Sequence, residues 1–423
     1  MANEVPSLDD RVMPAHKLEL TPEEAEFAAT QGREADDPVP DPSSLSDETL
    51  EEEAAPPPQP ADAGPSVKWP ANDKDAPDYR HLSTSQILVD STFRLTPDDI
   101  ELVLSANRFD PHGKFKGDDA TQNEVIAIAM RGLMLGQGRN EIENARSVEV
   151  IDARPDHSQF RCVVGFYIRT QDPGTRTLTL YSGSTVPNPM LMKAYFDKVA
   201  AHAHEPFEKC NMLPTGCYVC RVDHHKDIEP ALRMAEPDDL KSDATCTVQR
   251  TFNDLTYGLD DLWDIAHPYD NVHCAYATFY NGNWRASFSS EGCITVRGRR
   301  TPTDQWAKFE AVLNKIGMQR RCDLVLLTGR DLAVASKLRG TNQADNAAVV
   351  QRELVCLRAG STGEEVRRLR SKLGLPDGTY FGANVKKHLA DKQSAMSAGK
   401  EIDGIYSPAL DAQWGWGVLT AVA

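Results

Sequence analysis

The side chains best suited to chemistry are a histidine and a cysteine twenty residues apart. His273 lies at the end of a predicted strand, and Cys293 follows Ser290-Glu291-Gly292 in a tight turn. A thiol is largely un-ionised at neutral pH, so a catalytic cysteine needs a neighbouring imidazole that favours the thiolate. Glycine beside the cysteine lets a substrate approach, while backbone N–H groups face the developing oxyanion. The spacing therefore predicts that Cys293 is a nucleophile and His273 its base.

Other cysteines and histidines have the side-chain types of a zinc site. The set comprises Cys210, Cys217, Cys220, His224 and His225. However, Cys217 and Cys220 fall in a predicted strand, where positions three apart point to opposite faces. We therefore expect no metal and no cofactor. Cys274 is expected to be a buried, apolar-like side chain, because alternation along its strand points it away from His273.

The C-terminal region contains three units of a turn followed by a helix. The first spans 357–375, and the other two begin at Asp377-Gly378 and Asp403-Gly404. Ser407 is a suitable cap for the last helix, with Pro408 at its first position. This glycine-punctuated pattern resembles the peptidoglycan-binding-domain-1 family of three-helix modules, although Leu389-Ala390-Asp391-Lys392 replaces the usual Phe-Gln. The resemblance implies the bacterial cell wall as ligand.

The cysteine segment resembles the active-site signature of the L,D-transpeptidase (YkuD-like) family, in which a histidine precedes a Ser-His-Gly-Cys turn. An earlier stretch agrees, because a strand ending in Ser182-Gly183-Ser184 precedes Pro214-Thr215-Gly216-Cys217-Tyr218. The resemblance covers residues 178–327. It implies that Cys293 accepts the acyl group, that His273 is its base, and that backbone N–H groups around Gly292 and Cys293 bind the oxyanion.

Two residues depart from that signature. Glu291 stands where the family has histidine, and Thr295 stands where it commonly has arginine, with Arg297 two positions later. We expect Glu291 to orient an imidazole and Arg297 to hold a substrate carboxylate, with Ser290 also at the substrate. The polar stretch 250–261 is either a lid or substrate wall, in which Arg250 contacts the stem peptide, or a surface loop.

Charge is concentrated at the N-terminus. Residues 1–80 hold 20 acidic and 6 basic side chains and 13 of the 27 prolines, whereas the remaining chain has a net charge of only −3. Such a segment buries too little apolar surface to offset its ordering entropy, so 1–85 is predicted to be a disordered, acidic, Pro-rich tail. The nearly neutral remainder has no basic field for a phosphate backbone, which excludes nucleic acid as an expected partner.

The predicted fold class is α+β: a mostly-β L,D-transpeptidase-like domain with flanking helices, a small C-terminal three-helix module and the disordered tail. The expected domains are a small helical segment at 86–146, a catalytic domain at 147–335, a linker at 336–351 and a peptidoglycan-binding-like domain at 352–416. A helix is predicted to start at Thr96-Pro97, and further helices are predicted at 121–135, 190–203 and 303–316. Strands are predicted at 162–168, 177–181, 217–222 and 323–327.

Together these features predict a cell-wall-acting cysteine enzyme that attacks peptidoglycan stem peptides, by transpeptidation or by hydrolysis. The alternative is a catalytically inactive wall-binding protein of a structural or injection-associated kind. We expect synthesis in the cytoplasm without a signal peptide, because the N-terminus lacks a basic and an apolar region, and no membrane insertion. The cell wall or periplasm would then be reached by non-classical export, injection or lysis. The tail is either a spacer or a docking segment for a secretion-system or phage-particle partner.

Overall fold

The computed structural model describes residues 89–153, 155, 157, 159–188, 211–225, 229–250, 262–275, 288, 290–298, 304–396 and 402–419. All of them belong to the compact unit Pro58–Ala423. The predicted tail and the predicted helix at 190–203 lie outside the described residues. Strands outnumber helices, which confirms the α+β class of the described chain.

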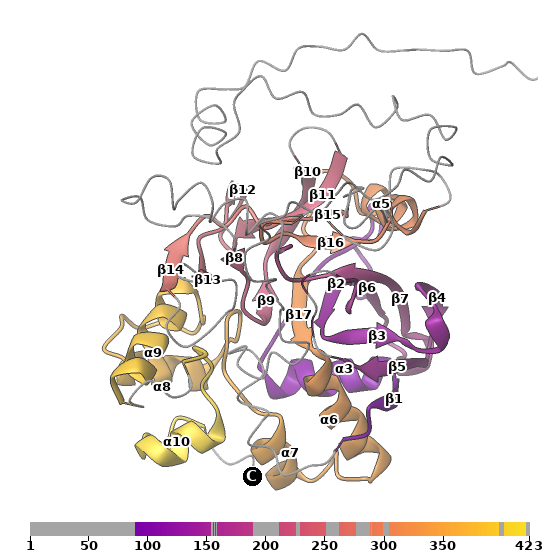
Figure 1. Ribbon diagram of the computed structural model, residues 1–423. Coiled ribbons are helices and arrows are strands. Elements are labelled where there is room, and N and C mark those ends of the chain that lie inside the picture. The colour runs from indigo at the N-terminus through magenta and orange to yellow at the C-terminus, as the bar shows by residue number, and fades with distance from the viewer. Residues whose placement is uncertain are drawn as a thin grey trace, which may run out of the picture. The chain divides into compact units, whose positions relative to one another are not determined.

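An eleven-stranded mixed sheet is the main element of the described chain (Figure 1). Its strands are β2 (Glu124–Arg131), β4 (Glu141–Ala145), β6 (Cys162–Arg169), β7 (Thr177–Ser184), β9 (Gly216–Tyr218), β10 (Cys220–His225), β11 (Glu229–Glu236), β12 (Asp239–Asp243), β15 (Val272–Cys274), β16 (Ile294–Val296) and β17 (Leu324–Thr328). The main path is β10-β11-β15-β16-β7-β6-β2-β17-β9, with β12 beside β11 and β4 beside β7. The pairs β15–β16 and β2–β17 are parallel.

Two smaller sheets and the helices complete the described chain. One sheet joins β1 (Thr92–Leu95), β5 (Val148–Asp152) and β3 (Leu133–Leu135); the other joins β14 (Leu262–Ala266), β13 (Cys246–Arg250) and β8 (Asn211–Met212). The α-helices are α3 (Pro97–Ala106), α5 (Gln305–Ile316), α6 (Gly329–Gly340), α7 (Ala347–Glu353), α8 (Glu364–Lys372), α9 (Ala383–Met396) and α10 (Pro408–Trp414). Short 3₁₀ turns lie at Gly136–Gly138 and Pro173–Thr175.

The large sheet curls until its two ends meet. The edge strand β10 contacts the segment that leads into β17, where the Cys322 N–H donates to the Cys220 carbonyl at 2.9 Å. Helix α5 covers one part of the sheet with Trp306, Phe309 and Leu313, all fully buried. A second apolar cluster contains α3, α6 and side chains of the C-terminal helices. The sheet is thus enclosed by helices of both chain halves.

The helix predicted at 121–135 is wrong. This segment forms β2 and β3, and β2 lies between β6 and β17 in the sheet. A central strand is apolar on both faces, so Val125–Met130 is a continuous apolar run rather than an alternating one. The segment 86–146 therefore contributes one α-helix and four strands, not a helical layer.

Several predicted elements are confirmed. The strands at 162–168, 177–181 and 323–327 are present as β6, β7 and β17, and the predicted helix near 303–316 is α5. Helix α3 begins as expected: the Thr96 N–H donates to Asp99 Oδ2 at 2.7 Å, with Pro97 at the first position. Ser407 caps α10 by accepting from the Leu410 N–H.

The segment 336–351 is not an extended linker, because α6 and α7 occupy most of it. The C-terminal helices that follow are tied to the sheet through Arg358, whose side chain is fully buried. Arg358 Nη2 lies 3.0 Å from Asp331 Oδ1, and its other nitrogens donate to Asn107 Oδ1 at 2.6 Å and Thr215 Oγ1 at 2.8 Å. The Cys217 N–H also donates to the Ala359 carbonyl.

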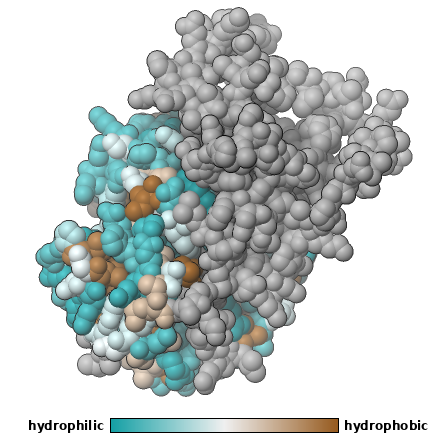
Figure 2. Space-filling model, turned by 60° about the vertical axis from the view of Figure 1, so that its left-hand side comes forward, coloured by the Kyte–Doolittle hydropathy of each residue, from teal (hydrophilic) through white to brown (hydrophobic). Residues whose placement is uncertain are grey.

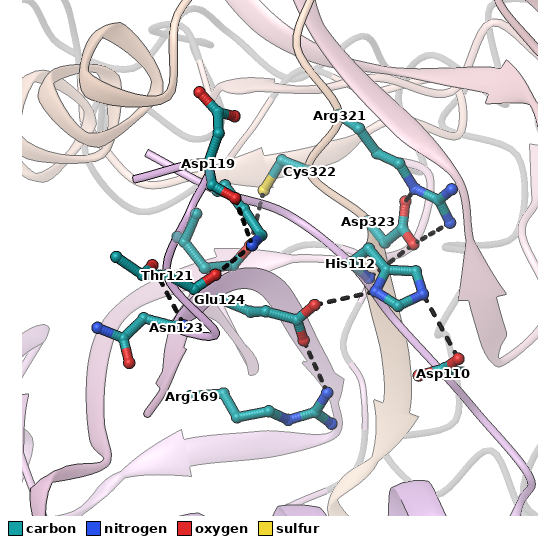
Figure 3. Close-up of polar contacts among 12 residues, drawn as sticks. Asp110, His112, Asp119, Thr121, Asn123, Glu124, Arg169, Arg321, Cys322 and Asp323 are labelled. Atoms are coloured by element: carbon teal, nitrogen blue, oxygen red, sulfur yellow. Dashed lines mark hydrogen bonds and ion pairs between the residues drawn. The ribbon is translucent and has the colours of Figure 1, made fainter. Parts of the chain in front are cut away.

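A second polar network fixes the loop before β2 (Figure 3). His112 lies between Asp110 and Glu124, and its backbone N–H donates to Asp323 Oδ2 at 2.9 Å. The hydrogen bond that the His112 ring donates to the Glu124 carboxylate raises the pKa of His112. Because Asp323 immediately precedes β17, this network anchors the loop to the parallel pair β2–β17.

The described surface is mainly polar on the face shown in Figure 2, with small, separate apolar patches. Large apolar side chains that are at least a third exposed are few in the described part: Tyr269, Met318, Tyr380 and Met396. No described helix has both the length and the apolar character needed to cross a bilayer.

A substitution of Arg358 tests whether its buried contacts hold the C-terminal helices against the sheet. Replacing Arg358 with Met leaves Asp331 buried without its cation, which costs about 3–5 kcal/mol of unfolding free energy. Urea unfolding measures the loss. The matched control is Arg367→Met, because Arg367 is half exposed in its ion pair with Glu364, and exposed pairs contribute less than about 1 kcal/mol. Equal losses in the two variants would contradict this account.

Candidate functional site

Parallel pairing of β15 with β16 brings the two predicted catalytic residues to neighbouring strands. The register places Val272 beside Ile294 and His273 beside Thr295. Extending it by one residue places Asn271 beside Cys293, and the Ile294 N–H donates to the Asn271 carbonyl at 2.9 Å. Strand spacing and rise then put the Cα atoms of His273 and Cys293 about 8 Å apart on the same sheet face.

The segment Tyr269–Asn271 encloses the cysteine turn. The Cys293 thiol donates to the Tyr269 carbonyl at 3.6 Å. Gly292 has a φ of +154°, and a Cβ there would lie 2.5 Å from Asp270 Oδ1 and 2.8 Å from the Asn211 carbonyl oxygen. Only glycine fits this position. Tyr269 itself adopts a left-handed backbone, with φ 53°, and 42% of it is exposed.

Ser290 organises the turn from within. Its Oγ donates to the Cys293 carbonyl at 2.7 Å and accepts from the Gly292 N–H at 3.0 Å. The Asn211 N–H donates to the Glu291 carbonyl at 2.9 Å, which fixes the turn to β8. The Gly292 N–H, predicted as an oxyanion donor, is thus already bonded to Ser290. Ser290 is 3% exposed, so it supports the turn and does not face a substrate.

His273 is 3% exposed, and its tautomer is fixed by the backbone. Its Nδ1 lies 2.6 Å from the Cys274 carbonyl oxygen. A carbonyl only accepts, so Nδ1 carries a proton and the neutral ring has its lone pair on Nε2. That arrangement is the one a general base requires.

Three neighbours of His273 were not predicted as site residues. His225, the last residue of β10, stacks on His273 with ring centroids 4.2 Å apart and planes at 17°. Asn271 Nδ2 lies 2.9 Å from His225 Nδ1. Glu229 is fully buried and accepts from the Cys274 thiol at 3.1 and 3.2 Å. Cys274 is buried among apolar side chains as expected, but its thiol is bonded to a carboxylate.

Sequence reasoning missed these neighbours because strand pairing alone brings them together. His225 and His273 are 48 positions apart, and the connection runs through β11. The pattern Asp270-Asn271 directly before a strand was the one available signal, since Asp and Asn often make local contacts at strand ends.

Asp270 is the most perturbed acid beside the turn. Burial raises its pKa to about 8, although the positive charges of Arg250 and Arg131 favour the ionised form. Its Oδ2 and the Oδ1 of Asn211 are buried acceptors without a donor in the described chain. A proton on Asp270 supplies a donor for this pair, so the neutral acid is the form that the fold favours.

Of the remaining predicted substrate residues, Arg297 lies apart from the thiol. Arg297 follows β16, four residues and about 13 Å along the strand from Cys293. Its Nη1 donates to Asn140 Oδ1 at 2.5 Å, and its guanidinium lies over the Phe160 ring. Arg250 is 4% exposed and lies 3.3 Å from Asp264. Glu291 is partly exposed at the turn itself.

A small hollow of about 10 Å³, roughly the size of one water molecule, lies next to the Tyr269 segment. Arg233 and Asp243 line it together with Tyr269, and Arg233 Nη2 lies 2.7 Å from Asp243 Oδ2. The hollow therefore combines a cation, an anion and an aromatic ring.

The single strand predicted at 217–222 is divided, because Cys217 and Cys220 lie in different short strands, β9 and β10. The described residues contain no group of three side chains able to hold a metal. Cys210 and most of the polar stretch 250–261, including the proposed lid, lie outside the described residues.

Comparison of the chain with protein-family models, curated proteins and solved structures gave no significant match.

The raised pKa of Asp270 predicts that the free energy of unfolding depends on pH. Its folded-state pKa of about 8 exceeds the ordinary 3.8, so its stabilising contribution is full below pH 4 and declines as pH rises to about 8. Asp270→Asn mimics the neutral acid and should remove this decline, which amounts to at most about 1.4 kcal/mol per pH unit. Urea unfolding at pH 5, 6, 7 and 8 measures it. Exposed Asp238→Asn should retain the wild-type slope; an identical slope in Asp270→Asn would refute the assignment.

Proposed function

We propose that this chain is a cysteine enzyme that attacks peptidoglycan stem peptides through a thioester on Cys293. The observation that carries the proposal is selective exposure of one thiol: among the eight described cysteines, seven are buried and Cys293 is partly exposed. It lies in a rigid turn on the sheet face that also carries His273. Burial makes the other thiols poor nucleophiles; for example, it raises the pKa of Cys162.

The proposed reaction uses these two side chains in sequence. His273 Nε2 accepts the Cys293 proton, and the thiolate attacks the carbonyl carbon of a stem-peptide amide. The C–N bond breaks as the imidazolium returns its proton to the leaving amine, which leaves an acyl thioester. An amine acceptor then gives transpeptidation, whereas water gives hydrolysis. The Cys293 N–H is the oxyanion donor in this scheme, since the Gly292 N–H is bonded to Ser290.

The surface around Tyr269 is the proposed contact for the stem peptide, which carries both amines and carboxylates. Arg233 would pair with a carboxylate and Asp243 with an amine, while the Tyr269 ring covers apolar parts. These residues are proposed because they lie around Tyr269, whose carbonyl accepts from the Cys293 thiol.

The helices α8–α10 are proposed to bind the cell wall. Their docking through Arg358 would hold bound wall at a fixed position relative to Cys293. The N-terminal tail is proposed as a spacer or as a docking segment for an export, injection or phage-particle partner. The site of action proposed is the cell wall or periplasm, with no role in binding nucleic acid.

A second candidate is a wall-binding protein without catalysis. Two observations favour it: the Gly292 N–H is occupied by Ser290, and Arg297 is held by Asn140. Both reduce the set of groups available to a transition state.

Muropeptide analysis of purified peptidoglycan after incubation with the protein separates these functions. New cross-linked muropeptides indicate transpeptidation, and shortened or separated stems indicate hydrolysis. Cys293→Ala should abolish either change, because the acyl acceptor is lost. The matched control is Cys322→Ala, which removes a buried thiol just before β17 and should leave product amounts within about twofold, since deleting one buried atom acts on stability. Wall binding with no product change from the wild-type protein would favour the second candidate.

A further inference from the structure

The stacked imidazoles of His225 and His273 are a titrating unit, not two separate histidines. Both rings are over nine-tenths buried, and their centroids are 4.2 Å apart. Two imidazolium ions at that distance repel strongly with little water between them. A single imidazolium under a neutral ring is favourable, because the ring face attracts a cation. The pair therefore binds its first proton more readily than its second, which repulsion opposes.

Hydrogen bonds determine which ring receives that proton. His273 Nδ1 already donates to the Cys274 carbonyl, so protonation at Nε2 preserves this bond. His225 Nδ1 accepts from Asn271 Nδ2. Protonation of His225 Nδ1 would place two hydrogen-bond donors against each other, which is unfavourable. The first proton is therefore favoured on His273.

We propose that His225 and Asn271 are positioning residues that confine the shared proton to His273, and so maintain His273 as the acid and base for Cys293. The proposal rests on the cysteine chemistry proposed above, and it adds a second histidine and an amide to it. His225 acts through its stacked ring, and Asn271 acts through the amide that keeps His225 neutral.

The groups around the pair are compatible with one positive charge. Glu229, from β11, is fully buried and bonded to the Cys274 thiol next to His273, so it supplies a nearby carboxyl group. Asp270 precedes Asn271 and is favoured as the neutral acid by burial. Cys293 lies beside Asn271 on the adjoining strand. These titratable groups come from β11, from the turn before β16 and from the loop before β15, within the described part of the chain.

Nuclear magnetic resonance of ¹³C- and ¹⁵N-labelled imidazoles in the full-length protein tests the proposal directly. In the wild-type protein, His273 should become charged first on acidification, with His225 following more than about one pH unit lower because of repulsion. Asn271→Asp replaces the donor by an acceptor, so His225 should become charged first. His225→Phe keeps a stacked ring and should leave His273 with a single, uncoupled titration.

The matched control is His224→Phe. His224 is the neighbouring residue on β10, its side chain is 44% exposed, and alternation points it to the opposite face. This variant should leave the order and spacing of the two titrations unchanged. A wild-type protein in which His225 charges first, or an Asn271→Asp variant with unchanged order, would overturn the proposal.

This readout does not depend on peptidoglycan. If the two histidines titrate in the predicted order but muropeptides do not change, the proposed proton arrangement is supported and the proposed function is contradicted. Altered muropeptides together with independent titration of the two histidines would support the proposed function and contradict the proposed proton arrangement.

Discussion

The candidate site depends on one constraint, which is the enclosure of the turn 292–294 by residues 269–271. Three successive contacts create it: the Cys293 thiol to the Tyr269 carbonyl, Gly292 against Asp270, and the Ile294 N–H to the Asn271 carbonyl. Parallel pairing of β15 and β16 continues directly from these contacts. Because a Cβ does not fit at Gly292, the thiol position is set by backbone packing and not by the cysteine side chain alone.

Burial of the side chains around this turn determines which of them carry a charge. Asp270 is favoured as a neutral acid by burial, which avoids a fixed negative charge beside a thiol that must ionise. The stacked histidines limit the pair to one positive charge. Farther away, Arg358 bonds Thr215, three residues beyond β8, and Asn211 in β8 fixes the Glu291 carbonyl. The C-terminal helices thereby buttress the strand that supports the turn.

Local patterns in the sequence predicted much of the fold. The strands β6, β7 and β17 and the cap of α3 follow from composition, turns and spacing, whereas the catalytic pairing of Cys293 with His273 stays a prediction. The segment 121–135 was misassigned because a strand buried on both faces lacks the alternation that distinguishes it from a helix. His225 and Asp270 were missed because strand order and burial, which local patterns do not encode, bring them to the cysteine. Arg297 was placed too near because an extended strand separates four residues by about 13 Å.

The central claim is that the fold selects Cys293 for nucleophilic chemistry, and competitive alkylation of the native protein tests it most directly. Limiting iodoacetamide at pH 7, followed by mass spectrometry of cysteine-containing peptides, reports the modification rate of each described thiol. The account predicts that Cys293 reacts at least about tenfold faster than the seven buried described cysteines, because it alone among them is partly exposed. Modification of Cys293 at the rate of the buried thiols, or slower, would contradict it.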